Sequence, residues 1–311
     1  MTDRPALVFD GVHKSYGRSK ALSGLSFSIP RGSICGFVGP NGAGKTTTFS
    51  VVSGFLAPDA GTLDILGLPA FDPWALKGRL GVLPQDAELS DRHTPRELLV
   101  HLGRLQGLAA RAARTEAERV LALVRLGDRS DSRIASLSHG MRRRVAVGSA
   151  LLGSPELVLL DEPMAGLDPL QAKSLREALT AVRGLQTLVV SSHNLDELER
   201  FCDYVVMIDK GRTLREGTVH EVTGQSALVE WDVVGAPSLE ALHAALPGHT
   251  FAMVDGVMTQ SAPEGADLDA SSIVVVRVLG ESGVGLREVR RGVGLERRFL
   301  SDALAESADV P

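Results

Sequence analysis

The sequence has little cysteine, no long apolar run and no excess of positive charge. Its 311 residues include two cysteines, Cys35 and Cys202, which lie far apart and form no Cys-x-x-Cys pair. Neither a disulfide framework nor a zinc site is therefore expected, and two isolated thiols are typical of a reducing cytosol. No segment approaches the roughly 18 consecutive apolar residues that a membrane-spanning helix needs. We therefore expect any membrane role to depend on a partner.

The N-terminal residues and the net charge exclude further classes of protein. The segment Met-Thr-Asp-Arg-Pro lacks the basic-then-apolar pattern of a signal peptide. The formal net charge is −5 and the pI is about 5.9, so no general attraction to nucleic acid or anionic lipid is expected. Hydrophobic residues make up 44% and charged residues 23%, a composition typical of a globular protein. The length is sufficient for two domains.

A glycine-rich segment at residues 39–46 carries the clearest chemical signal. It reads Gly-Pro-Asn-Gly-Ala-Gly-Lys-Thr, follows a short apolar run and precedes a helix-like segment, as the phosphate-loop pattern Gly-x-x-x-x-Gly-Lys-Thr requires. In such a loop the backbone N–H groups and the N-terminus of the next helix attract phosphate. Lys45 is expected to reach the β- and γ-phosphates, and the Thr46 hydroxyl to bind magnesium. The predicted nucleotide contacts of this segment are Gly39, Pro40, Asn41, Gly42, Ala43, Gly44, Lys45, Thr46 and Thr47.

An acidic pair closes a second apolar run. Residues 157–160 read Leu-Val-Leu-Leu and are followed by Asp161 and Glu162, which favours a central parallel strand covered on both faces. An Asp-Glu pair alone is commonly a helix cap or a solvated corner. Together with a phosphate loop, it predicts that Asp161 holds magnesium through Thr46 and water, and that Glu162 orients and polarises the attacking water.

Hydrophobic periodicity predicts an α/β core followed by a smaller domain. Strand patterns recur from residue 6 to residue 208 and are interrupted by a helical pattern at about 86–155. The composition changes at Gly224, so we expect one domain at 1–223 and a C-terminal α+β domain at 224–311. In the latter, Ile273–Leu279 is expected to be a strand because it is rich in valine, and Glu296–Ala305 is expected to be a helix.

Further motifs resemble those of the nucleotide-binding subunits of ABC transporters, over about residues 5–223. In the order that the family shows, they are an A-loop aromatic (Tyr16), a Q-loop (Gln85), an LSGGQ-like signature (Leu137-Ser138-His139-Gly140-Met141), a D-loop (Ala165-Gly166-Leu167-Asp168) and an H-loop histidine (His193). The resemblance implies a RecA-like phosphate-loop NTPase core with an N-terminal antiparallel β subdomain. It also implies binding of ATP and Mg²⁺, and ATP hydrolysis.

The resemblance assigns roles to single residues, and each role has a structural alternative. Tyr16 would stack on adenine, or it would anchor a strand corner. Gln85 would contact magnesium or the attacking water, or it would be an ordinary loop amide. His193 would contact the γ-phosphate and hold Glu162, although a lone histidine after a strand is usually structural. Asp168 would shape a dimer interface and would also cap the helix that starts at Pro169.

The signature segment is expected to contact the γ-phosphate bound by the opposite subunit, through Ser138 and Gly140. His139 and Met141 stand where the family pattern has glycine and glutamine. A histidine at this position predicts a pH-sensitive contact. ATPase activity that is unchanged by His139→Gly between about pH 6 and 8 would contradict that hypothesis.

The end of the chain adds a shorter resemblance. Leu295–Leu300 reads Leu-Glu-Arg-Arg-Phe-Leu and resembles the ending of bacterial drug- and antibiotic-exporter ATPases of the daunorubicin type, with an ordinary amphipathic helix as the alternative. The resemblance implies a separate integral-membrane permease and a peripheral place on the cytoplasmic face of the inner membrane. The single phosphate loop means that a second ATPase subunit is needed, and the intact Glu162, His193 and most of the signature favour a homodimer. No nucleic-acid partner is expected. A soluble ABC-type ATPase and an ATP-gated regulator are alternatives. The transported substrate is not indicated.

Overall fold

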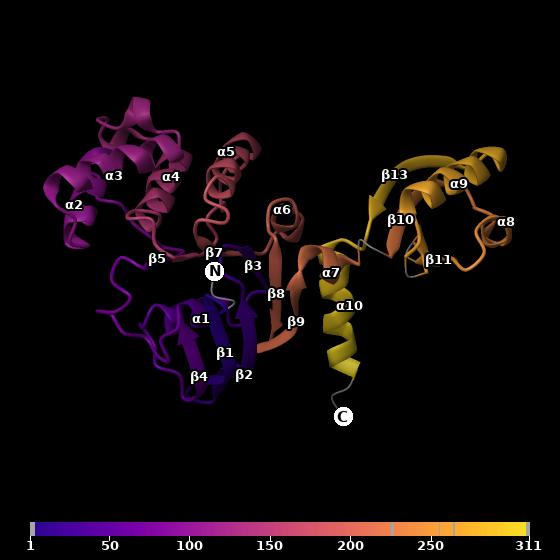
Figure 1. Cartoon of the computed structure of the whole chain (residues 1–311), viewed down its shortest axis with the longest axis horizontal. Coiled ribbons are helices and arrows are strands. Elements are labelled where there is room, and N and C mark those ends of the chain that lie inside the picture. Colours follow the sequence, from indigo (N-terminus) through magenta and orange to yellow (C-terminus); the bar gives the residue numbers. More distant parts are fainter. Residues whose placement is uncertain (1–3, 225–226, 255, 264, 309–311) are drawn as a thin grey trace. The chain divides into compact units, whose positions relative to one another are not determined.

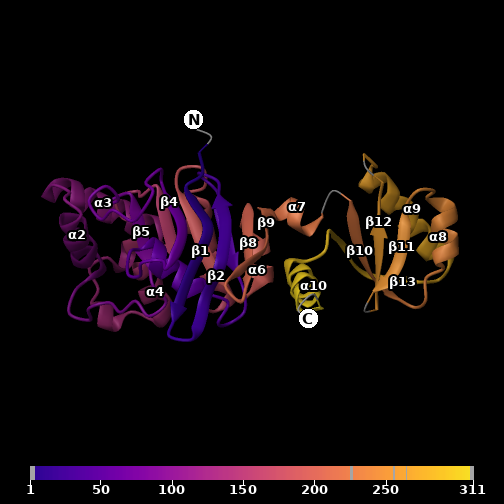
Figure 2. The same ribbon diagram turned by 90° about the horizontal axis from the view of Figure 1, so that it is seen from below.

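The computed structural model describes residues 4–224, 227–254, 256–263 and 265–308. These residues form two compact units, Met1–Glu216 and Gly217–Pro311, and most of their elements are labelled in Figures 1 and 2. The boundary between the two units lies after Glu216, earlier in the chain than the boundary expected after Thr223. The reason is that helix α7 (Val219–Thr223) packs against helix α10 (Leu295–Ala308) within the second unit.

A six-stranded sheet forms the centre of the first unit. Its order is β5-β6-β7-β3-β8-β9, and β5 with β6, β6 with β7, β7 with β3, and β3 with β8 all pair in parallel. The strands are β3 (Ile34–Val38), β5 (Leu80–Leu83), β6 (Leu157–Leu160), β7 (Thr187–Ser192), β8 (Tyr204–Asp209) and β9 (Arg212–Thr218). All residues of β3, β6 and β7 are buried, as continuous apolar strands in a doubly covered sheet require. Parallel strands end at the same edge, so the residues that follow β3, β6 and β7 are brought together.

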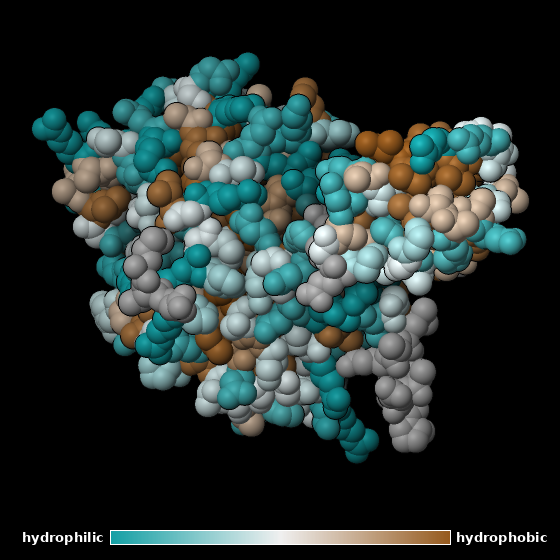
Figure 3. Space-filling view, turned by 45° about the vertical axis from the view of Figure 1, so that its right-hand side comes forward, coloured by the Kyte–Doolittle hydropathy of each residue, from teal (hydrophilic) through white to brown (hydrophobic). Residues whose placement is uncertain are grey.

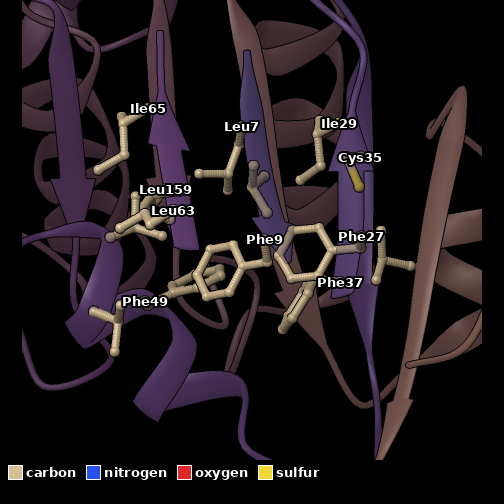
Figure 4. Packing of buried hydrophobic residues seen from close by; sticks show 14 of the residues in the cluster. Leu7, Phe9, Phe27, Ile29, Cys35, Phe37, Phe49, Leu63, Ile65 and Leu159 are labelled. Carbon is tan, nitrogen blue, oxygen red and sulfur yellow. The ribbon is translucent and has the colours of Figure 1, made fainter. Parts of the chain in front are cut away.

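A three-stranded antiparallel sheet packs beside the phosphate-loop helix. It consists of β1 (Leu7–Tyr16), β2 (Ser19–Ile29) and β4 (Ala60–Ile65) in the order β2-β1-β4. Phe9 of β1 stacks on Phe27 of β2 with ring centroids 4.6 Å apart, and Phe27 contacts Phe37 of β3 at 5.4 Å, as Figure 4 shows. Phe49 of helix α1 (Lys45–Val52) joins this core, 5.9 Å from Phe37. The helix that follows the phosphate loop is therefore anchored in a hydrophobic core that it shares with β1, β2, β3 and β4.

The expected helical insertion lies between β5 and β6. It contains α2 (Pro95–Leu105), α3 (Ala110–Leu123), α4 (His139–Ala150) and the short 3₁₀ turns at Gly127–Arg129 and Ile134–Ser136. Thr94 caps α2 in a capping box with Glu97, as the sequence pattern predicts. A hydrophobic cluster that includes Leu99, Leu121 and Val145 joins the three helices. Two helices follow β6 and β7, namely α5 (Pro169–Thr180) and α6 (Leu195–Glu199).

The second unit is an α+β arrangement, as expected. Its four-stranded antiparallel sheet has the order β11-β12-β10-β13. Its further elements are β10 (Leu228–Val234), α8 (Leu239–Ala245), β11 (Thr250–Val254), β12 (Val257–Ser261), α9 (Leu268–Glu281) and β13 (Gly285–Arg291). Trp231 is fully buried at the centre of its core. Hydrophobic side chains also reach the surface of this unit (Figure 3). Ile273 of α9, for example, is 73% exposed.

The expectation of a strand at Ile273–Leu279 is wrong, because this segment lies within α9. Asp267 caps the helix by accepting hydrogen bonds from the backbone N–H groups of Asp269 and Ala270. The buried residues Leu268, Ser271, Val275 and Leu279 recur at spacings of three and four, so they line one face of a helix. Packing of that face outweighs the strand preference of the valines.

A buried polar chain crosses the core of the second unit and yields a stability prediction. The Trp231 indole donates to Gln260 Oε1 at 3.1 Å, and Gln260 Nε2 donates to Ser271 Oγ at 3.1 Å. Gln260→Met removes both partners and leaves buried polar atoms unsatisfied, which is expected to lower the free energy of unfolding of this unit by about 1–3 kcal/mol. Denaturant titration followed by tryptophan fluorescence measures the change, since Trp231 is buried whereas Trp74 is already 84% exposed. A loss below about 0.5 kcal/mol would contradict the prediction.

Within the described ranges, no helix has both the length and the apolar character needed to cross a membrane.

Candidate functional site

A cavity of about 460 Å³ lies at the edge where the parallel strands end. Its volume is within the usual range of small-molecule sites, roughly 300–1,000 Å³. The lining includes the following predicted site residues: Pro40, Asn41, Gly42, Gly44, Lys45, Thr46, Thr47, Gln85, Asp161, Glu162 and His193. Ser19, Lys20 and Ala21 at the start of β2 and Ala165 line it as well. Most of the predicted residues are therefore brought to one place.

Two glycines of the phosphate loop are required by the backbone. A Cβ atom on Gly39 would lie 2.4 Å from the carbonyl oxygen of Ile208, so no larger residue fits there. Gly44 has a φ of +110° and precedes the first residue of α1, and this left-handed conformation favours glycine. The loop therefore leads directly into the N-terminus of α1, where free backbone N–H groups and the helix dipole favour an anion.

Lys45 lies inside the loop that it follows. Its Nζ donates to the carbonyl oxygens of Gly39 at 2.5 Å and Pro40 at 3.1 Å, and the residue is only 8% exposed. Burial lowers the pKa of Lys45, and the carboxylates of Glu162 and Asp161 partly offset that effect. A cation with so little solvent is a strong electrostatic partner for a phosphate group that enters the cavity.

The Thr46 hydroxyl faces the Asp161 carboxylate. Thr46 Oγ1 donates to Asp161 Oδ2 at 3.4 Å, and Asp161 is 3% exposed. The other carboxylate oxygen, Oδ1, accepts a hydrogen bond of 2.5 Å from the hydroxyl of Ser191. The structure thus leaves a hydroxyl and one carboxylate oxygen side by side, and hard oxygen ligands of this kind are the ones Mg²⁺ prefers.

Glu162 and His193 form the second predicted pair. His193 Nδ1 lies 3.1 Å from both carboxylate oxygens of Glu162. The side chain of Glu162 is 12% exposed and that of His193 is 70% exposed. The backbone of Glu162 has a φ of +47°, a left-handed conformation that is uncommon for a residue other than glycine. A partly buried carboxylate oriented by a histidine is suited to binding and deprotonating a water molecule.

The remaining predicted residues lie outside this cavity's lining. Gly39 and Ala43 are buried. Tyr16 ends β1, is 50% exposed, and pairs with Ser19, which does line the cavity. Ser138 caps α4 by accepting from the backbone N–H of Met141 at 3.3 Å, and Gly140 lies in the first turn of that helix.

Comparisons with known proteins agree with this arrangement. A family model described as ABC transporter matches residues 22–165. A daunorubicin resistance ATP-binding protein from Streptomyces coeruleorubidus is 36% identical over 300 residues, covering 95% of each chain. The chain belongs to the ABC transporter ATP-binding proteins. A Nod factor export ATP-binding protein I from Mesorhizobium japonicum is also similar to this ABC ATPase, with 35% identity over 95% of this chain and 86% of the relative.

The fold of solved ABC ATPases is similar too. The structure of cbiO1 from Clostridium perfringens, part of an ABC transporter complex, has a TM-score of 0.65 and 26% identity, covering 71% of this chain and 91% of that one. The motif resemblance to ABC transporter subunits and the expected fold class are therefore confirmed. The protein is an ATP-binding ATPase subunit of an ABC transporter.

Sequence reasoning missed two residues of this ABC ATPase that contact the acidic pair. Ser191 contacts both Asp161 and Glu162, and Arg143 of α4 donates to several carbonyl oxygens around them. Ser191 could be found by counting along the paired strands, because Leu160 pairs with Val190 and the next residues are Asp161 and Ser191. Arg143 carries no comparable signal, since it is the middle one of three consecutive arginines.

Proposed function

We propose that this ABC ATPase binds Mg·ATP in the cavity, hydrolyses it as a homodimer, and powers export through a separate membrane permease. The observation that supports the proposal most is the convergence of Lys45, Thr46, Asp161, Glu162 and His193 on one cavity. Lys45 and Thr46 begin helix α1 after the loop that follows β3, whereas Asp161 and Glu162 follow β6 and His193 follows β7. Together these side chains supply a cation, metal ligands and a base.

The phosphate end of ATP is held by the loop and by Lys45. The backbone N–H groups of the loop and the N-terminus of α1 face the phosphates, and Lys45 exchanges its two carbonyl contacts for the β- and γ-phosphate oxygens. Thr46 and Asp161 fit magnesium because each presents an oxygen ligand on the same side of the cavity. Bound Mg²⁺ neutralises charge on the phosphates, and Gln85 at the cavity wall is available to it or to the attacking water.

Glu162 is the proposed base. It takes a proton from the water that attacks the γ-phosphate, and this contribution is typically about 10²–10⁴-fold in rate. His193 holds the carboxylate through its 3.1 Å contacts and is placed to contact the γ-phosphate. The electrostatic field of Lys45 favours the charge that develops on the transferred group.

Tyr16 is the proposed stacking partner of adenine, since it is half-exposed and pairs with Ser19, which lines the cavity. Tyr16→Ala is expected to weaken ATP binding by about tenfold, because stacking of a base on an aromatic ring is worth about 1–3 kcal/mol. Tyr16→Phe keeps the ring and is expected to bind normally. Titration with a fluorescent ATP analogue measures the affinities. Tripolyphosphate has no adenine base and serves as the control ligand in a competition measurement. If Tyr16→Ala weakened the binding of tripolyphosphate as much as the binding of ATP, stacking of Tyr16 on adenine would be contradicted.

The proposed dimer follows from the position of the signature residues. Ser138 and Gly140 lie at the N-terminus of α4 and do not line the cavity of their own subunit. In a head-to-tail dimer, the Ser138 hydroxyl and the α4 N-terminus contact the γ-phosphate held by the other subunit. The chain has one phosphate loop and an intact Glu162 and His193, so two identical subunits supply two equivalent sites.

The proposed direction of transport rests on the relatives, whose names describe daunorubicin resistance and Nod factor export. We place the protein at the cytoplasmic face of the inner membrane, where it contacts the membrane through the permease. The permease, rather than this chain, selects the substrate. Residues 1–223 carry the nucleotide chemistry in this proposal, and 224–311 form an accessory domain.

Affinity capture tests the partner directly. Tagged Glu162→Gln protein is captured with Mg·ATP from detergent-solubilised membranes, and bound proteins are identified by mass spectrometry. Recovery of a protein with several membrane spans would support the proposal that this ABC ATPase works with a membrane permease. Recovery of soluble partners alone, from a preparation that retains its membrane proteins, would instead favour a soluble ABC-type ATPase. Phosphate release by the wild-type protein is measured as well. Its presence would exclude an ATP-gated regulator that binds ATP without turnover, whichever partners are recovered.

A further inference from the structure

Both peptide groups of Glu162 are held by side chains from outside its motif. The backbone N–H of Glu162 donates to Ser191 Oγ at 2.9 Å, and its carbonyl oxygen accepts from Arg143 Nη2 at 2.8 Å. Because Glu162 has a φ of +47°, its conformation is intrinsically unfavourable and persists only where the surroundings determine it. These two contacts act on both sides of the strained residue.

Ser191 approaches from the neighbouring strand. It lies near the end of β7 and is fully buried. Its hydroxyl donates to Asp161 Oδ1 at 2.5 Å while it accepts the N–H of Glu162. One hydroxyl therefore fixes the orientation of the Asp161 carboxylate and the start of the Glu162 turn.

Arg143 approaches from the signature helix α4. Its guanidinium donates to four backbone carbonyl oxygens, two from Nη2 at 2.8 Å to Asp161 and Glu162, one from Nε at 3.1 Å to Pro163, and one from Nη1 at 3.2 Å to Gln85. Burial lowers the pKa of Arg143, and Asp161, Glu162 and Asp86 partly offset that effect. The rigid fork of donors suits several converging carbonyls, which a lysine ammonium cannot satisfy in the same way.

We propose that Ser191 and Arg143 are positioning residues that clamp the Glu162 backbone and so aim its carboxylate. The inference rests on the proposed function, in which Glu162 is the base. Without the clamp, the turn relaxes toward ordinary backbone conformations and the carboxylate leaves His193. Displacements of about 1 Å at a reacting group commonly cost on the order of a hundredfold in rate. Since Arg143 belongs to the helix that Ser138 caps, the clamp also links the position of the signature segment to the aim of Glu162.

The experiment separates the hydroxyl of Ser191 from its volume. Ser191→Thr and Ser191→Val have the same shape, and only threonine keeps the hydroxyl. Ser191→Val is expected to lower kcat roughly 10- to 100-fold relative to Ser191→Thr, as loss of a supporting hydrogen bond commonly does, while KM for ATP changes less than about threefold.

Arg143→Met and Arg143→Lys form the second pair of variants. Both are expected to lose activity, and Arg143→Met is expected to lose more than Arg143→Lys. Arg114→Met, at an exposed position of α3, controls for loss of an arginine. Thermal melting confirms that each variant is folded.

A double-mutant cycle decides whether the clamp acts through Glu162. In the Glu162→Gln background, single-turnover hydrolysis is expected to show a much smaller further loss from Ser191→Val or Arg143→Met, because the group that they aim is already absent. Any loss that remains for Ser191→Val reports its second contact, with Asp161. Equal losses in both backgrounds, or equal kcat for Ser191→Val and Ser191→Thr, would overturn the clamp. Failure of the proposed function gives a different result, since Glu162→Gln alone would then retain wild-type turnover.

Discussion

Replacing Glu162 by glutamine is expected to lower ATP turnover by about 10²- to 10⁴-fold, the usual contribution of a general base. Glutamine keeps the size of the side chain and a hydrogen bond to His193, whose Nδ1 lies 3.1 Å from both carboxylate oxygens. It does not accept the proton of the attacking water. ATP binding is therefore retained, and an ATP-bound dimer accumulates. Phosphate release measures the rate, and size-exclusion chromatography with Mg·ATP measures the dimer.

Glu118→Gln is the matched control, because Glu118 is exposed on α3 and pairs with Arg96 at the surface. It makes the same chemical change away from the cavity and is expected to turn over ATP normally. Wild-type turnover by Glu162→Gln would remove Glu162 from the mechanism. Loss of ATP binding together with turnover would show instead that the carboxylate supports the nucleotide site.

Lys45→Met is expected to lower turnover at least about 100-fold, because it removes a preorganised cation from the phosphates. Nucleotide affinity is expected to fall with it. Lys45 is 8% exposed and lies among the carbonyls of its own loop, so its charge is little screened by water. Methionine keeps most of the volume of the buried stem. Nucleotide titration and phosphate release are measured on the same preparation.

Lys173→Met provides the comparison for Lys45. Lys173 is exposed on α5, so its loss is expected to leave ATP binding and turnover unchanged. If Lys45→Met bound and hydrolysed ATP as well as Lys173→Met did, the loop backbone alone would carry the phosphate contacts. The cation would then have no part in the reaction.

The parts of the site that sequence patterns predict are those in which residue type and strand position coincide. The apolar runs before Gly39, Asp161 and His193 indicate buried parallel strands, and parallel strands end at one edge. The meeting of these residues around one cavity follows from that rule. The glycines and Lys45 are recognisable because a phosphate loop needs these types at this spacing.

Other features depend on tertiary contacts that no local pattern contains. Arg143 stands between two further arginines, and only the turn at the end of β6 determines which of the three reaches the Glu162 carbonyl. The valines around Ile273 favour a strand by local preference, but the cap at Asp267 and the buried face of α9 make a helix. Likewise, α7 joins the second unit through its packing on α10, which residue composition does not reveal.

The pairing of β3 has a consequence for how the protein is made on the ribosome. β3, at Ile34–Val38, hydrogen-bonds to β7 and β8, which lie at Thr187–Ser192 and Tyr204–Asp209. At about 5–20 residues per second, the nascent chain carries the phosphate loop for on the order of 10 s before both neighbours of β3 leave the exit tunnel. During that time an apolar segment lacks its partner strands and is available to chaperones or to aggregation. Nucleotide binding therefore begins late in translation, although the loop is among the first segments to be synthesised.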